Sequence, residues 1–220
     1  MKKTSILFLF TVFCSIQNIQ TYAEMNPFFS EFKTPYKIPP FELIQDEHYK
    51  PAFYRAMESH LNEVDAITSN IDSPSFTNTI IALEKSGKDL DVVSSTFFNL
   101  QSSNTNDIMD EIAAEIGPKL SGHYDAIYLN KELFNRVKSV YNTSSELDLN
   151  TEQLRLISEM YKDFIRSGAQ LNEESMSVLT EINQELSSLT IQFDQNLLKE
   201  TNIPSDKIEG DSELALMFLI

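Results

Sequence analysis

The sequence is poor in the residues that most often carry chemistry: of 220 residues, five are glycine, three are histidine, one is cysteine and none is tryptophan. So few glycines argue against glycine-rich phosphate loops and against β folds with many tight turns. The single cysteine, Cys14, cannot form an internal disulfide. Basic residues are also scarce, because 17 Lys and Arg stand against 33 Asp and Glu and give a net charge of −16. Nucleic acid is therefore not an expected partner, since phosphate binding requires clustered Lys and Arg.

The first 23 residues have the pattern of a secretory signal peptide. Lys2 and Lys3 precede a short apolar run at 6–13, and a small-residue cleavage site ends at Ala23. The run is too short to span a bilayer, which needs about 20 apolar residues, so no membrane span is expected. We expect an exported protein, with the bacterial periplasm as its compartment. A lipoprotein anchored through Cys14 is the less favoured alternative, because the bulky Phe13 stands before that cysteine.

Residues 24–45 are predicted to form an extended arm. Four prolines in this segment exclude a regular helix or a central strand. Five interleaved aromatic residues make the segment too apolar for a free linker. We expect the arm to lie on the surface of the domain that follows.

From residue 46 to residue 210, apolar residues recur at steps of three and four, and no stretch shows sustained alternation. This pattern predicts an all-α domain of about six helices, packed as an antiparallel bundle. Breaks are expected at 70–74, near 106, near 130, at 142–150 and at 168–172, where polar residues, glycine or proline interrupt the pattern.

Four local features of these helices lead to specific expectations. Asp46 is predicted to cap the first helix. Gly87, inside the stripe of the second, indicates close packing or a local break. Gly117-Pro118 is expected to kink or split the third. The stripe at 179–197, which contains Leu186 and Phe193, predicts an antiparallel hairpin between the last two helices.

The search for catalytic and metal-binding residues yields none. A zinc peptidase helix requires His-Glu-x-x-His, and the sequence contains no such motif. His48, His60 and His123 are too far apart in sequence to bind a metal from adjacent helical turns, so we interpret them as capping or structural residues. No serine lies in a recognised nucleophile motif. We therefore assign no catalytic, cofactor-binding or metal residue, and no cofactor, to this chain.

Six short segments in order nevertheless resemble a known family. They are residues 51–53 (PAF), 74–80 (PSFTNTI), 82–87 (ALEKSG), 129–137 (LNKELFNRV), 164–169 (FIRSGA) and 181–201. This series is similar to the N-terminal helical region of the peptidyl-dipeptidase (dipeptidyl carboxypeptidase) branch of the thimet oligopeptidase-like zinc metallopeptidases. The similarity extends from about residue 25 to about residue 203.

The resemblance implies a helical clamshell around a deep channel, in which oligopeptides are cleaved and C-terminal dipeptides are released. It also implies a zinc ion on a His-Glu-x-x-His helix in the C-terminal half, and no residue of this sequence matches that motif. Residues 211–220 end in an abrupt apolar tail, Met217 to Ile220, which led us to expect a truncated chain.

Two hypotheses follow. The first is an N-terminal, substrate-channel fragment of a secreted zinc peptidyl-dipeptidase. It is inactive by itself and is completed only by a C-terminal partner chain. The second is a non-catalytic helical module of the bacterial envelope that binds peptides or a protein.

Overall fold

The computed structural model describes residues 26–201, and within this range it contains helices and no strand. The prediction of an all-α fold is therefore confirmed. The predicted signal peptide at 1–23 and the apolar tail at 211–220 lie outside the described residues. Across the described part of the chain, no helix combines the length and the apolar character needed to cross a bilayer.

The N-terminal arm leads into the first long helix. Two short 3-10 turns, η1 (Pro27–Phe29) and η2 (Pro35–Lys37), precede α2 (Asp46–Thr68). Phe28 lies 5.5 Å from the ring of Tyr49, and the Arg55 guanidinium lies 4.4 Å from the ring centre of Phe29. The Asn26 side chain donates a hydrogen bond of 2.9 Å to the His48 carbonyl. These contacts fix the arm to the first half of α2.

The second helical segment is interrupted. A π-helical turn, η3 (Phe76–Ile81), leads into α3 (Ala82–Glu84), and α4 (Lys88–Ser103) begins after Gly87. Gly87 has the left-handed backbone conformation, with φ of 73°. Both features expected of Gly87 occur: it is closely packed, against the ring of His60, and it marks a local break in the helical segment.

Four further helices complete the described chain. They are α5 (Asp107–Tyr128), α6 (Lys131–Thr143), α7 (Thr151–Arg166) and α8 (Glu173–Thr201), with a short turn, η4 (Ser144–Glu146), after α6. Two expectations are corrected here. Helix α5 continues through Gly117 and Pro118, so the predicted split is absent. The residue that caps α2 is Gln45, in a reciprocal arrangement with His48, and Asp46 is the first helical residue.

Two apolar clusters hold these helices together. The first joins α2, α4 and the first half of α5, where Phe97 is in edge contact with Tyr49 and Phe53 at centroid distances of 5.0 and 5.4 Å. The second joins the end of α2, η3, α6 and α7 around Phe164, which is fully buried. Burial of a large apolar side chain contributes about 1.5–3 kcal/mol, so these clusters set the positions of the long helices.

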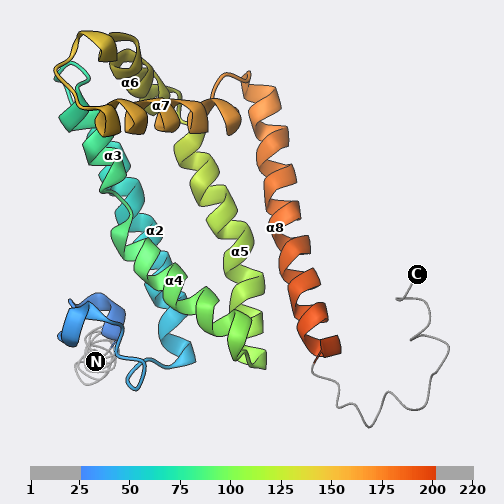
Figure 1. Cartoon of the computed structure of the whole chain (residues 1–220). Coiled ribbons are helices and arrows are strands. Elements are labelled where there is room, and N and C mark those ends of the chain that lie inside the picture. The colour runs from blue at the N-terminus through green and yellow to red at the C-terminus, as the bar shows by residue number, and fades with distance from the viewer. Residues whose placement is uncertain (1–25, 202–220) are drawn as a thin grey trace, which may run out of the picture.

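The last two helices do not form the predicted hairpin. Helix α8 packs along α5, while α7 packs on α6 and crosses the end of α5 (Figure 1). Gly168, with φ of 95°, redirects the chain between α7 and α8. Its position lies against Leu129 at the end of α5, as well as against Leu171 and Leu179. The turn therefore places α8 beside α5 instead of folding it back on α7.

Candidate functional site

Helix α8 contacts α5 through small and polar residues. Gly117 and Gly122 of α5 lie directly under α8: a Cβ at Gly117 would be 2.0 Å from the Ile191 Cδ1 atom, and one at Gly122 would be 2.8 Å from the Gln184 amide nitrogen. Asn183 donates a hydrogen bond of 2.8 Å to the Asp125 carboxylate, and Gln195 donates one of 2.9 Å to the Asp110 carbonyl. The face of α8 that packs on α5 is thus close-fitting and combines polar residues with the apolar Ile191.

The most apolar face of α8 points away from α5. Its members are spaced by four, four, three and four residues and are all more than half exposed: Val178 (51%), Ile182 (53%), Leu186 (59%), Leu189 (54%) and Phe193 (65%). We call these five residues the α8 apolar face. Successive steps of three and four keep side chains on one side of a helix, so this face is continuous. Contiguous exposed apolar surface of this kind marks an interaction site.

Acidic residues border this apolar face. Glu174, Glu181 and Glu185 are exposed on α8, and the only basic residue of the helix is Lys199 in its last turn. Glu181 and Glu185 lie next to Ile182 and Leu186 in sequence, so they stand along one edge of the stripe. The surface is therefore suited to a helix or strand whose apolar side is flanked by Lys or Arg.

A groove extends the same surface toward α4. It has a volume of about 560 Å³ and lies between α5 and α8, with Phe98 of α4 at one wall. Leu120 of α5, together with Leu186 and Ile191 of α8, supplies further apolar lining, while Asp194 supplies a carboxylate. Leu186 belongs both to the groove and to the α8 apolar face, so the groove and the face form one continuous surface.

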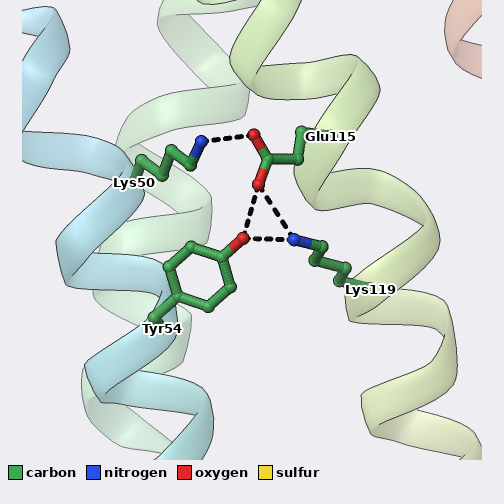
Figure 2. A network of polar contacts seen from close by, with 4 residues as sticks. All are labelled: Lys50, Tyr54, Glu115 and Lys119. Carbon is green, nitrogen blue, oxygen red and sulfur yellow. Dashed lines mark hydrogen bonds and ion pairs between the residues drawn. The ribbon is translucent and has the colours of Figure 1, made fainter.

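A charged network ties α2 to α5 on another part of the surface (Figure 2). The Glu115 carboxylate accepts hydrogen bonds from Lys50 at 2.5 Å, from the Tyr54 hydroxyl at 2.5 Å and from Lys119 at 2.9 Å. Lys119 also donates a short hydrogen bond to the Tyr54 oxygen. The hydrogen bonds from Lys50, Tyr54 and Lys119 lower the pKa of Glu115 to about 2. Sequence reasoning missed this network, although the i, i+4 pairs Lys50/Tyr54 and Glu115/Lys119 are its signal.

The three histidines do not provide a metal site. His48 accepts a hydrogen bond of 3.0 Å from the Gln45 backbone N–H at the start of α2. His60 and His123 are buried and hydrogen-bonded to each other, with 3.0 Å between His123 Nε2 and His60 Nδ1. No three His, Cys, Asp or Glu side chains within residues 26–201 converge as a metal-binding set. The described residues therefore do not fit a catalytic zinc ion, which requires three protein ligands around one point.

Comparison with known proteins identifies relatives over most of the chain. A dipeptidyl carboxypeptidase of Escherichia coli strain K12 is 38% identical over 174 residues, which are 79% of this chain and 26% of the relative. The dipeptidyl carboxypeptidase of Salmonella typhimurium strain LT2 is 38% identical over 173 residues, or 79% of this chain and 25% of the relative. An oligopeptidase A of Haemophilus influenzae is 29% identical over 180 residues, or 81% of this chain and 26% of the relative.

These matches test the family resemblance that the six short segments indicated. They confirm the relation to the peptidyl-dipeptidase branch. The chain spans about a quarter of the length of these curated relatives. No protein-family model matches the chain.

Proposed function

The chain is homologous to the N-terminal region of the dipeptidyl carboxypeptidase and oligopeptidase A family, and on this basis we propose that it is the helical substrate-channel part of an oligopeptide-cleaving peptidase. In this proposal the chain supplies one wall of the channel around the peptide. The zinc-binding residues come from the part of the family fold that lies outside the region matched by this chain. The 220-residue chain does not release dipeptides by itself. The groove beside α8 is one surface that an extended peptide could follow.

The observation that carries the proposal is the α8 apolar face. In a helix that is packed on one neighbour only, the apolar side is expected to face that neighbour, because burial of each large side chain contributes about 1.5–3 kcal/mol. Here Asn183 and Gln195 bond to α5 and Ile191 packs on Gly117, while the five residues of the α8 apolar face are exposed. This arrangement is suited to a helix that is sandwiched between α5 and a further structural unit.

The remainder of the peptidase fold is the partner that we propose for this face. The relatives are about four times as long as the matched region, so they possess the additional structure that could cover α8. A second copy of the chain is a poorer occupant, because Glu181 and Glu185 along the edge of one stripe would meet those of the other. Like charges brought together at an interface oppose association.

Complementation of a relative tests the proposal. The 220-residue chain is mixed with E. coli dipeptidyl carboxypeptidase from which the matching quarter has been removed, and release of dipeptides from a blocked peptide is measured with added zinc. We expect no turnover from either part alone and turnover from the mixture. The double variant Leu186→Glu/Leu189→Glu is expected to abolish the complex, while Gln192→Glu, an exposed change beside the stripe, preserves it.

Two outcomes would contradict the proposal. The first is chelator-sensitive dipeptide release by the 220-residue chain itself. The second is the absence of any complex, detected by size-exclusion chromatography, between the wild-type chain and the truncated relative. Binding of peptides in the absence of both complex and turnover would instead support the non-catalytic binding module.

A further inference from the structure

A chain of three hydrogen bonds runs through the joint between α2, α5 and the turn before α4. His123 Nε2 of α5 lies 3.0 Å from His60 Nδ1 of α2, and His60 Nε2 lies 3.2 Å from the Ser86 hydroxyl oxygen. That hydroxyl donates a hydrogen bond of 2.7 Å to the Leu83 carbonyl. Both imidazole rings are more than nine-tenths buried, with 8% of His60 and 6% of His123 exposed.

The direction of these bonds fixes the protonation state of both rings. Because the Ser86 hydrogen is used toward Leu83, its oxygen accepts from His60, and His60 must carry its hydrogen on Nε2. His60 Nδ1 is then a bare acceptor, and the hydrogen between the rings belongs to His123 Nε2. His123 Nδ1 is left without a hydrogen, and it has no hydrogen-bond partner among the described residues. The arrangement is complete only when both rings are neutral.

The break at Gly87 in the second helical segment lies at the same joint. The ring of His60 lies against Gly87, where a Cβ would be 2.6 Å from His60 Cε1. The backbone N–H of Gly87 donates a hydrogen bond of 2.7 Å to the Glu63 carboxylate, one turn further along α2. The position of the His60 ring therefore determines how the start of α4 is placed on α2.

One side of the pair is connected to solvent. His60 lines a cavity of about 260 Å³ between α3, α5 and α7, together with four carboxylates: Glu84, Asp91, Glu159 and Asp163. Tyr124, whose ring lies 5.4 Å from His123 and 6.5 Å from His60, separates the pair from part of this cavity. Glu63 on α2 and Asp91 on α4 are the charged groups that act on His60. Protons can therefore reach His60 from an acidic, open cavity.

Burial opposes a positive charge on either ring. It lowers the pKa of His60 below its ordinary value, although Glu63 and Asp91 act in the opposite direction. Burial, followed by the neighbouring His60, lowers the pKa of His123 to about 4. The pair consequently stays neutral at pH values at which a histidine in an unfolded chain, with a pKa of about 6.5, is already charged.

From this geometry we propose that the His60–His123 pair is a one-proton switch. When both rings are neutral, the three hydrogen bonds lock α2, α5 and the Ser86–Gly87 turn together. When the pair takes up a proton, the added hydrogen lies on His123 Nδ1, because His60 Nε2 already carries a hydrogen and only one hydrogen fits between the rings. That nitrogen is buried and has no acceptor among the described residues. The His123 ring must turn to find one, which breaks its bond to His60, frees the His60 ring from Gly87 and loosens the start of α4.

The sign of the pH effect follows from linkage. The unfolded chain binds more protons than the folded chain as pH falls from about 6.5 toward 4, so folded stability is fully present above 6.5 and decreases below it. Each additional proton bound by the unfolded state raises the unfolding equilibrium constant by up to about tenfold per pH unit. The joint should therefore loosen as the solution becomes mildly acidic.

Imidazole titration by ¹⁵N NMR on the 220-residue chain tests the switch directly, since the chain has three histidines. Between pH 7.5 and 5, we expect His123 to stay neutral with its hydrogen on Nε2. We also expect the protection factors of the amides at residues 85–91, which correct for the slower chemical exchange at lower pH, to fall as pH falls. Two independent titrations of His60 and His123 near pH 6.5 would overturn the proposal.

Two variants distinguish a protonation switch at His123 from a purely structural role of that residue. His123→Gln retains an N–H donor toward His60 but cannot be protonated, so its urea midpoint should change less between pH 7.5 and 5.5 than that of the wild type. His48→Gln, which leaves the buried pair intact, is the matched control and should retain the larger change. Equal pH dependence in the wild type and in His123→Gln would also overturn the proposal. If His123→Gln does not fold, the wild-type titration decides the question.

Discussion

Gly87 sits where three requirements meet in a single residue. Its backbone has a φ of 73°, its N–H is bound to Glu63, and its missing side chain leaves room for the ring of His60. The left-handed conformation costs a residue with a Cβ about 1–2 kcal/mol. Glycine is therefore the residue that permits the break before α4.

The substitution Gly87→Ala should accordingly destabilise the fold by at least about 1–2 kcal/mol, because the new Cβ is strained and also meets the His60 ring. Urea unfolding followed by circular dichroism measures this loss. Gly122→Ala is the matched control: it lies inside α5 and would meet only the end of the flexible Gln184 side chain. There the gain in helix propensity, up to about 1 kcal/mol, should make the change neutral or stabilising. An unchanged urea midpoint for Gly87→Ala would contradict this account.

At the scale of elements, the pairing of α5 with α8 depends on the absence of side chains. Gly117 allows Ile191 to lie almost on the α5 backbone, and Asn183 and Gln195 supply the directional bonds to α5. Interiors are close-packed, so a single added methyl group at such a contact is felt. Helix α7, in contrast, begins with a reciprocal cap between Asn150 and Gln153, with bonds of 2.9 and 3.0 Å, that is local in sequence.

A double-mutant cycle on Gly117 and Ile191 measures this contact. In the Ile191→Ala background the near neighbour that remains is the Ser187 hydroxyl, 3.2 Å from the added Cβ, so Gly117→Ala should be neutral or stabilise the chain by up to about 0.5–1 kcal/mol through helix propensity. In the wild-type background the added Cβ, 2.0 Å from Ile191 Cδ1, should cancel or reverse that gain. We expect an interaction free energy of about 0.5–3 kcal/mol from urea unfolding. Strict additivity would show that α8 is not seated on Gly117 as described.

At the scale of the whole molecule, the distribution of apolar surface is unusual. Two buried clusters account for the contacts among α2, α4, α5, α6 and α7. Helix α8 contributes little to either cluster, because Ile191 alone of its residues packs against the first. Helix α8 lies at the outside of the helical array (Figure 1), and the α8 apolar face remains exposed.

We predict that this exposed face makes the chain self-associate at high concentration despite its net charge of −16. Sedimentation velocity over a range of concentrations and at low and high salt would detect this, with association increasing as salt screens the acidic edge. Leu186→Glu/Leu189→Glu should abolish association without loss of thermal stability, since both residues are already exposed. A wild-type chain that remains monomeric at high concentration and high salt would argue against the proposed role of this face.

How much of this could be read from the sequence depends on the range of the interaction. The polar interval at 142–150 and the end of α2 near residue 70 follow from local patterns and occur as predicted. The relation to peptidyl-dipeptidases was likewise visible in six short segments and is confirmed by relatives of 38% identity. Of the kink or split expected at Gly117-Pro118, the split does not occur, because packing of α8 and of the first cluster on α5 outweighs the local preference of proline.

The sequence by itself determined the helical character of residues 46–201, the absence of a His-Glu-x-x-His helix and the existence of an apolar stripe on the last helix, because these depend on residue type and spacing along the chain. Only the tertiary structure decided which way that stripe faces. Periodicity defines which residues share a side of a helix. Which neighbouring helix that side contacts depends on how well the side chains of the two helices pack together. The fit of Ile191 to Gly117 and of Asn183 to Asp125 left the apolar stripe facing outward. The hydrogen bond between His60 and His123, which are 63 residues apart, could not be predicted from the sequence because it also depends on how the helices pack.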